Sequence, residues 1–311
     1  MLQYIENQGI DRLKWDACIE QSSNGLIYAF SWWLDAVTDH WDALILGNYE
    51  AVLPLVWNQK WGFKSIYPPF EIQQLGVFAK KKLTQQQFED FVKAIPSDFQ
   101  RIQLRLNSHN NFRVQDFSRR DLVNYVLPLN LPYEKLRKQY GKNTLRNVKK
   151  AAQQEFYLDK NYSVKECVQL FKQLKENELG LGEKYYERIL VAMEEASSRN
   201  MGRVVGVLNK EEKLYALAFF GNSHQRLYNL MPATSPLGRK QGAMFFLIDA
   251  LIQEYAGSSY LLDFEGSMQE GVARFYKGFG GKIEPYYLLE RQQMKWYWKG
   301  LLEARSWIEN R

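Results

Sequence analysis

The sequence predicts an α+β fold in two domains, each a mixed, mostly antiparallel sheet flanked by helices. The chain has 311 residues, more than the roughly 100–200 residues of one average domain. Strand-like and helix-like segments also alternate along it, with three strands in hairpin order in the second half. We place the domain boundary after residue 125, which gives domains 1–125 and 126–311.

Composition indicates a well-packed chain. Hydrophobic residues make up 46% of the sequence and aromatic residues 15%, whereas disordered chains combine low hydrophobicity with high net charge. No apolar run approaches the roughly 20 residues that span a bilayer. The opening residues, Met1 to Glu6, have neither a basic start nor an apolar core, so we expect no signal peptide. These features predict a cytoplasmic protein.

Cysteine and histidine usage argues against a metal centre. Cys18 and Cys167 lie far apart and form no CxxC pair, which favours a reducing compartment over a disulfide framework. His40, His109 and His224 lack the clustering that a zinc site needs. No GxSxG turn supplies a serine nucleophile. We therefore expect neither metal nor serine-nucleophile chemistry.

The first domain alternates strand and helix signals. Ser31 is a plausible N-cap for a helix, and Pro54 is best placed at a strand edge or bulge. Residues 99–106 alternate apolar and polar side chains, as half-buried strands do. The other expected elements are strands at 43–47 and 51–57 and a helix at 87–94.

A strand at 124–129 crosses the domain boundary, and the second domain after it is more regular. Two short helices are expected up to residue 156, with a break near Gly141. After them we predict helices at 164–175 and 184–197, strands at 203–208, 214–221 and 226–232, a glycine-bearing loop at 235–243, a helix at 244–255, a strand at 260–264, a helix at 271–279 and a strand at 282–289.

This order of elements resembles the GNAT acyltransferase fold. Two helices, a β-meander, a glycine-bearing loop into a helix, a strand, a helix and a strand follow one another in 131–289. The resemblance implies an acyltransferase whose catalytic half is the second domain. It also implies acyl-CoA as cosubstrate, with no permanently bound cofactor.

The loop into the 244–255 helix is the expected phosphate site. Helix N-termini present unpaired N–H groups and partial positive charge, and glycine lets a ligand approach the backbone closely. Arg239, Lys240, Gln241, Gly242 and Ala243 are therefore the candidate residues for the pyrophosphate of coenzyme A or of another carrier. A plain connecting loop is the alternative interpretation.

Residues 273–281 resemble the GNAT segment in which an Ala and a Tyr, three apart, precede a Gly. In that family the tyrosine commonly protonates the departing thiolate, and Tyr276 occupies the matching position. A core aromatic with a satisfied hydroxyl is the alternative role for Tyr276.

The chain also resembles the Fem family of peptidoglycan aminoacyltransferases, which are built from tandem GNAT-like domains. In that family the lysine that corresponds to Lys277 lies near the reacting centre. The resemblance implies a degenerate first domain with a substrate-binding or structural role. The similar segments are 28–33, 51–55, 67–70, 143–151, 263–266 and 276–280. Residues 164–197 are too short for the long helical hairpin that some Fem proteins carry for tRNA.

Net charge is +6, and basic residues concentrate between 135 and 150. Lys142, Arg146 and Lys149 are candidate ligands for a substrate phosphate, through long-range attraction of anions. A solvated basic helix face is the alternative.

Two acids and a strand complete the predicted chemistry. Backbone N–H groups from Tyr228 to Met231, on a splayed strand, are placed to bind substrate and to stabilise an oxyanion. Asp263 or Glu265, at a strand end, is the expected acceptor of the amine proton. Tyr276 or Lys277 then assists the leaving group. A helix N-cap or a salt bridge is the alternative role for the acids.

Three functions remain open. The first is acyl transfer from acyl-CoA to a small-molecule or peptide amine. The second is transfer from aminoacyl-tRNA to a cell-wall precursor, in which the basic stretch contacts RNA. The third is a non-catalytic protein that binds RNA or a partner. They must be separated at the site, because a fold does not fix a function.

Overall fold

The computed structural model describes residues 1–60, 62–266 and 269–292, and its contacts divide them into two units. Unit 1 comprises, among the described residues, those from 1–24, 38–121 and 286–292. Unit 2 comprises Gly25–Val37 and Leu122–Pro285. The division is therefore discontinuous in sequence, whereas the sequence-based boundary at residue 125 divides the chain into continuous blocks.

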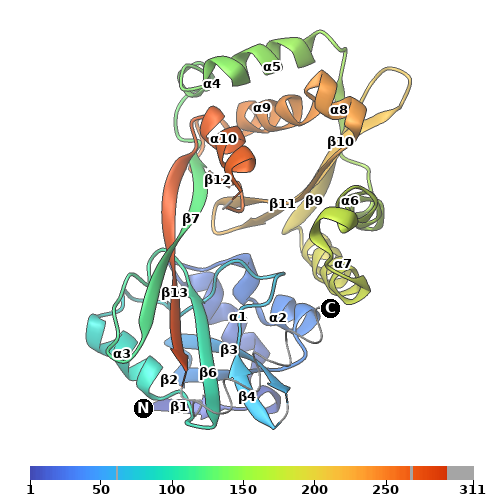
Figure 1. Cartoon of the computed structure of the whole chain (residues 1–311). Helices are drawn as coiled ribbons and strands as arrows, with labels where there is room; N and C mark the ends of the chain where they lie inside the picture. Colours follow the sequence, from blue (N-terminus) through green and yellow to red (C-terminus); the bar gives the residue numbers. More distant parts are fainter. Residues whose placement is uncertain (61, 267–268, 293–311) are drawn as a thin grey trace. The chain divides into compact units, whose positions relative to one another are not determined.

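Unit 1 contains a sheet with two flanking helices, α1 (Arg12–Gln21) and α3 (Gln85–Lys93) (Figure 1). The strand order is β1 (Leu2–Ile5), β2 (Trp41–Leu46), β3 (Ala51–Lys60), β4 (Phe63–Ile66), β6 (Phe99–Leu106) and β13 (Lys282–Gln292), and β5 (Phe78–Ala79) pairs with β3. β6 has the bounds that its alternating pattern predicts, and its inward residues join the buried cluster of α3.

Pro54 lies inside β3, where the pairing leaves room for a residue without an N–H. On one edge it pairs with Ala43 of β2. On the other edge β3 pairs with β5 at Ala51–Val52 and with β4 at Trp57–Lys60, and Pro54 falls in the interval between them. This placement follows the expectation that proline avoids full pairing on both edges.

Unit 2 is built on parallel and antiparallel strands. Their order is β7 (Ser118–Pro128), β12 (Leu261–Asp263), β11 (Arg226–Thr234), β10 (Leu214–Ser223), β9 (Gly202–Leu208) and β8 (Tyr157–Asp159). The β11–β12 pair is parallel and the other pairs are antiparallel. The meander β9–β10–β11 confirms the three strands predicted in hairpin order.

Helices cover both faces of the unit 2 strands (Figure 1). One face carries α4 (Tyr133–Arg137), α5 (Lys142–Ala152), α8 (Pro236–Gln241), α9 (Ala243–Tyr255) and α10 (Glu270–Gly278). The other carries α6 (Val164–Leu179) and α7 (Glu183–Ser198), and α2 (Ser31–Val37), preceded by a 3-10 turn at Ile27–Ala29, packs on α7. The predicted break between α4 and α5 is confirmed at Gly141, whose N–H donates to the Gly278 carbonyl.

The segment predicted as a loop at 235–243 is instead mostly helical. Ser235 caps α8 by accepting a hydrogen bond from the Gly238 N–H, and Pro236 occupies the first turn, where its missing N–H costs nothing. Gly242 ends α8 in the left-handed conformation, with φ +81°. The local cap and the proline therefore outweigh the two glycines that suggested a loop.

A half-buried carboxyl ties the α4–α5 segment to α9. Asp249 of α9 accepts hydrogen bonds from the hydroxyls of Tyr133 and Tyr140, at 3.0 and 2.9 Å. Burial raises the pKa of Asp249 in spite of these hydrogen bonds. The two tyrosines thus stabilise a charge that the core would otherwise disfavour.

None of the helices in the described ranges has both the length and the apolar character needed to cross a membrane.

Candidate functional site

β11 and β12 pair over only part of the length of β11. Their parallel pairing runs from Arg226 to Tyr228, where β12 ends at Asp263, and β11 continues to Thr234. A β-bulge interrupts the pairing of β10 with β11, and Met231 on the bulge has φ +50°. Because β12 is paired over its whole length and ends at Asp263, the splay and the oxyanion role of the 228–231 amides both stay predictions.

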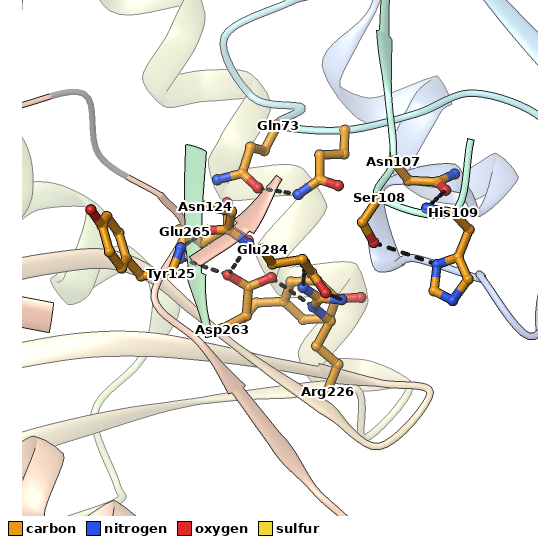
Figure 2. A network of polar contacts seen from close by, with 12 residues as sticks. Gln73, Asn107, Ser108, His109, Asn124, Tyr125, Arg226, Asp263, Glu265 and Glu284 are labelled. Atoms are coloured by element: carbon orange, nitrogen blue, oxygen red, sulfur yellow. Dashed lines mark hydrogen bonds and ion pairs between the residues drawn. The ribbon is translucent and has the colours of Figure 1, made fainter. Parts of the chain in front are cut away.

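The Asp263 carboxylate lies at the end of β12 in a closed polar network (Figure 2). It accepts hydrogen bonds from the Asn124 side chain at 2.9 Å, from Arg226 Nε at 2.6 Å and from the Glu265 N–H at 2.8 Å. Only 1% of Asp263 is exposed. A carboxylate held this way positions its neighbours, and accepting a proton would cost it these hydrogen bonds.

Arg226 links Asp263 to a second acid, Glu284. Its guanidinium donates to both carboxylates. Burial lowers the pKa of Arg226, but the charges of Asp263 and Glu284 outweigh that effect, so the net shift is upward. A salt bridge thus exists at Asp263, but its cation is Arg226, whereas the sequence-based alternative placed Arg274 or Lys277 there; Arg274 instead pairs with Glu270.

Glu265, the second predicted acid, has different contacts from Asp263. It follows β12 with φ +59°, is partly exposed and accepts a hydrogen bond from the Tyr28 hydroxyl. Burial of the carboxyl and the charge of Asp263 raise the pKa of Glu265 well above its ordinary value. This shift favours the protonated form of the carboxyl.

Tyr276 lies in the core of unit 2 close to these acids. It is 5% exposed and stacks on Phe264, with ring centroids 4.6 Å apart. Burial, followed by the charges of Glu265 and Asp263, raises the pKa of Tyr276. Its phenol therefore keeps its proton, which suits both a proton donor and a core aromatic.

Lys277, the next residue, is exposed, and its Nζ lies 5.6 Å from the ring centroid of Tyr125. Its predicted role near the reacting centre stays a prediction.

Tyr228 does not offer the free hydroxyl that a substrate-binding side chain would need. It is fully buried, accepts a hydrogen bond from the Ile27 N–H at 3.3 Å and lies 3.3 Å from Ser223 Oγ. The protein itself therefore occupies the hydroxyl, and the predicted substrate-binding role of Tyr228 stays a prediction for its backbone N–H.

The glycine turn differs from the expected phosphate site. The Gly242 N–H donates to the Gly238 carbonyl as the cap of α8, and Ala243 is fully buried. A Cβ atom at Gly242 would lie 3.1 Å from the Asn147 carbonyl oxygen, which shows how closely α5 covers this turn. The expectation of a free Gly242 amide is wrong, and the phosphate-binding roles of Arg239, Lys240 and Gln241 stay predictions.

Predicted cations from α5 and α8 instead form one surface. Lys150 Nζ donates to the Lys240 carbonyl at 2.6 Å, which holds the two helices together. None of the cations on this surface forms an ion pair within the described part of the chain. We call this the α5–α8 basic surface, and its exposed members are Lys142, Arg146, Lys149, Lys150, Arg239 and Lys240.

Sequence inspection missed three members of the site network, namely Arg226, Glu284 and Asn124. Each reaches Asp263 or its neighbour across 37 to 139 residues of chain. No local spacing carries that information. Tyr28 lies in a segment that resembles the Fem family, and this resemblance was the only indication in the sequence that Tyr28 belongs to the site.

No family model and no curated protein sequence matches this chain. Solved structures do match. FemX aligns with a TM-score of 0.64 and 9% identity over 92% of this chain and 96% of FemX. L-PGS from Bacillus licheniformis aligns with a TM-score of 0.53 and 11% identity over 97% of both chains. A tandem GNAT protein from the clavulanic acid biosynthesis pathway aligns with a TM-score of 0.52 and 9% identity, over 95% of this chain and 99% of that protein.

These similarities establish the fold. The chain has the Fem-like, GNAT-type architecture that its element order predicts, and the α+β class is confirmed. At such low identity the similarity speaks for the fold alone, and the function must be argued from the site.

Proposed function

We propose that this protein is an acyltransferase that moves an acyl group from a phosphate-bearing carrier to an amine. One observation carries the proposal. Glu265, a partly exposed carboxyl with a raised pKa, lies at the point where the β11–β12 pairing ends, and its charge acts on the buried Tyr276. Acid–base pairs with shifted pKa values are characteristic of functional sites.

The chemistry requires one bond to form and one to break. The amine nitrogen attacks the acyl carbonyl carbon, and the bond from that carbon to the carrier's oxygen or sulfur breaks. Glu265 accepts the proton that the amine loses, and Tyr276 supplies one to the departing carrier atom. Backbone N–H groups of β11 beyond Tyr228 stabilise the oxyanion of the tetrahedral intermediate.

For the acyl carrier, our proposal differs from the expectation drawn from the sequence. The sequence favours acyl-CoA, bound at the glycine turn. The Gly242 amide is engaged there and Ala243 is buried. The exposed cations of the α5–α8 basic surface are better matched to a larger polyanion, so we favour aminoacyl-tRNA over acyl-CoA as donor. The acceptor is a small-molecule or peptide amine.

Binding of charged tRNA tests the carrier. We expect the affinity for a mixed aminoacyl-tRNA pool to fall steeply with salt, because each neutralised phosphate releases counterions. The double variant Arg146→Ala/Lys149→Ala should weaken binding and reduce the slope of log K against log salt by roughly 1.5. Lys165→Ala/Lys213→Ala, which removes two exposed lysines elsewhere in unit 2, is the matched control. Equal effects of the two pairs would contradict a defined RNA surface.

Transfer is tested with Glu265→Gln, which keeps the size of the side chain and its ability to accept the Tyr28 hydrogen bond. We expect the rate of acyl transfer to a panel of primary amines to fall by roughly 10²–10⁴-fold, with tRNA affinity unchanged. An unchanged rate would remove Glu265 from the mechanism. RNA binding without transfer to any amine, from aminoacyl-tRNA or acetyl-CoA, would favour a non-catalytic protein.

A further inference from the structure

Among the described residues of unit 2, one buried side-chain amide oxygen, that of Asn229, has no hydrogen-bond partner. Asn229 is 2% exposed, and its Oδ1 makes no hydrogen bond to any residue in the described ranges. Other buried asparagines differ. Asn124 and Asn110 are equally enclosed, and both use their amides in hydrogen bonds. The unpartnered oxygen is therefore a property of this position.

Asn229 lies just beyond the pairing of the two central strands. It follows Tyr228, the last β11 residue paired with β12, and it precedes the bulge at Met231. Its backbone pairs with Phe220 of β10. Because directly opposite residues share a face of a sheet, the amide projects on the face that carries Phe220 and Tyr276 in one buried cluster.

A buried carbonyl-type oxygen without a donor is destabilising, and an apolar side chain of similar shape would avoid that penalty. The surrounding cluster consists of aromatic and aliphatic side chains. In such a setting the amide oxygen can accept a hydrogen bond from a donor group on a bound ligand. The edge of β11 beside it is where the proposed reaction takes place.

We propose that Asn229 is a positioning residue that holds the attacking amine. Its Oδ1 accepts one N–H of the amine, which turns the nitrogen lone pair toward the acyl carbon. That N–H bond stays intact while the amine's other proton leaves to Glu265, so Asn229 neither gains nor loses a proton. The inference rests on the proposed acyl transfer and adds the group that recognises the acceptor.

The test compares stability and kinetics in Asn229→Leu. Removing an unpartnered amide should raise Tm, by roughly 2–6 °C. Losing the contact to the amine should lower kcat/KM for a lysine-containing peptide by roughly 10-fold. KM for the acyl donor that supports transfer in the assay above should stay unchanged. A structural role would instead lower Tm and leave the two substrates equally affected.

A matched pair guards against misfolding of the leucine variant. Asn229→Ala and Asn110→Ala remove the same atoms, but only Asn110 loses hydrogen bonds, to the Val77 N–H and carbonyl. We expect Asn110→Ala to be the less stable of the two, with unaltered kcat/KM, and Asn229→Ala to show the kinetic loss.

Three results overturn the inference while acyl transfer stands. They are a lower Tm in Asn229→Leu, an unchanged kcat/KM for the peptide amine, or a rise in donor KM alone. A wild-type protein that transfers no acyl group to any amine overturns both the inference and the proposed function.

Discussion

Replacing Arg226 by methionine should destabilise unit 2 more than any surface change. The guanidinium bridges Asp263 and Glu284, and the three side chains are 10%, 2% and 18% exposed. Methionine fills similar volume but leaves both carboxylates without their cation. Breaking a buried pair in this way costs about 3–5 kcal/mol. For a unit of this size that lowers Tm by roughly 6–20 °C.

The loss should depend on pH with a definite sign. The charge of Arg226 lowers the pKa of Glu265, although burial and Asp263 still leave that pKa raised. Removing the cation raises the pKa of Glu265 further. The folded variant then binds more protons than the unfolded chain above the ordinary glutamate pKa of 4.5. Stability therefore falls as pH rises from that value, and the deficit is larger at pH 8 than at pH 5.

Urea unfolding followed by tryptophan fluorescence at the two pH values measures both effects, because urea, unlike guanidinium, does not screen charge. Lys210→Met is the control. Its partner is Glu155, the two side chains are 71% and 65% exposed, and such a pair contributes little. A loss below about 1 kcal/mol for Arg226→Met, a typical value for a surface pair, or one that is independent of pH, would refute the reasoning.

Three further predictions concern other parts of unit 2. Gly242→Ala places a Cβ at φ +81° and 3.1 Å from the Asn147 carbonyl, so urea unfolding should show a loss of about 1–3 kcal/mol; an unchanged midpoint contradicts this. Tyr140→Phe removes a hydroxyl from Asp249 and should cost about 1–2 kcal/mol by the same assay. Burial raises the pKa of Cys167 to about 12, so a thiol reagent at pH 8 should label it only on unfolding, and rapid labelling of the folded protein would count against its burial.

Local signals made many of the helices and strands predictable from the sequence, although α1, β1, β4, β5 and β8 were not predicted and α8 was expected to be a loop. Thr84 and Gln87 form a reciprocal capping box that starts α3, and the 99–106 alternation becomes β6 with the same bounds. Ser163 and Glu166 do the same at the start of α6. In each case the residues that specify the element are within four positions of one another, so a single sequence contains the information.

The candidate site was only partly predictable. Asp263 and Glu265 stood out because acids at a strand end are unusual, and the structure separates their roles through Arg226 and Tyr28. Those partners come from distant segments and leave no trace in local spacing. The expectation of a free Gly242 amide was wrong because the sequence indicates where a helix starts but not that the Asn147 carbonyl of α5 covers that turn.

The discontinuity of unit 2 has a consequence for how the chain is made. The Tyr28 hydroxyl meets Glu265, 237 residues further on, and the Ile27 N–H meets Tyr228 after 201. On the ribosome, residues 25–37 therefore emerge long before the surface that receives them, with Trp33 still in water. If the chain were expressed as two fragments divided between residues 121 and 122, the second fragment would lack α2. Adding residues 25–37 as a separate peptide should then restore the folded unit 2.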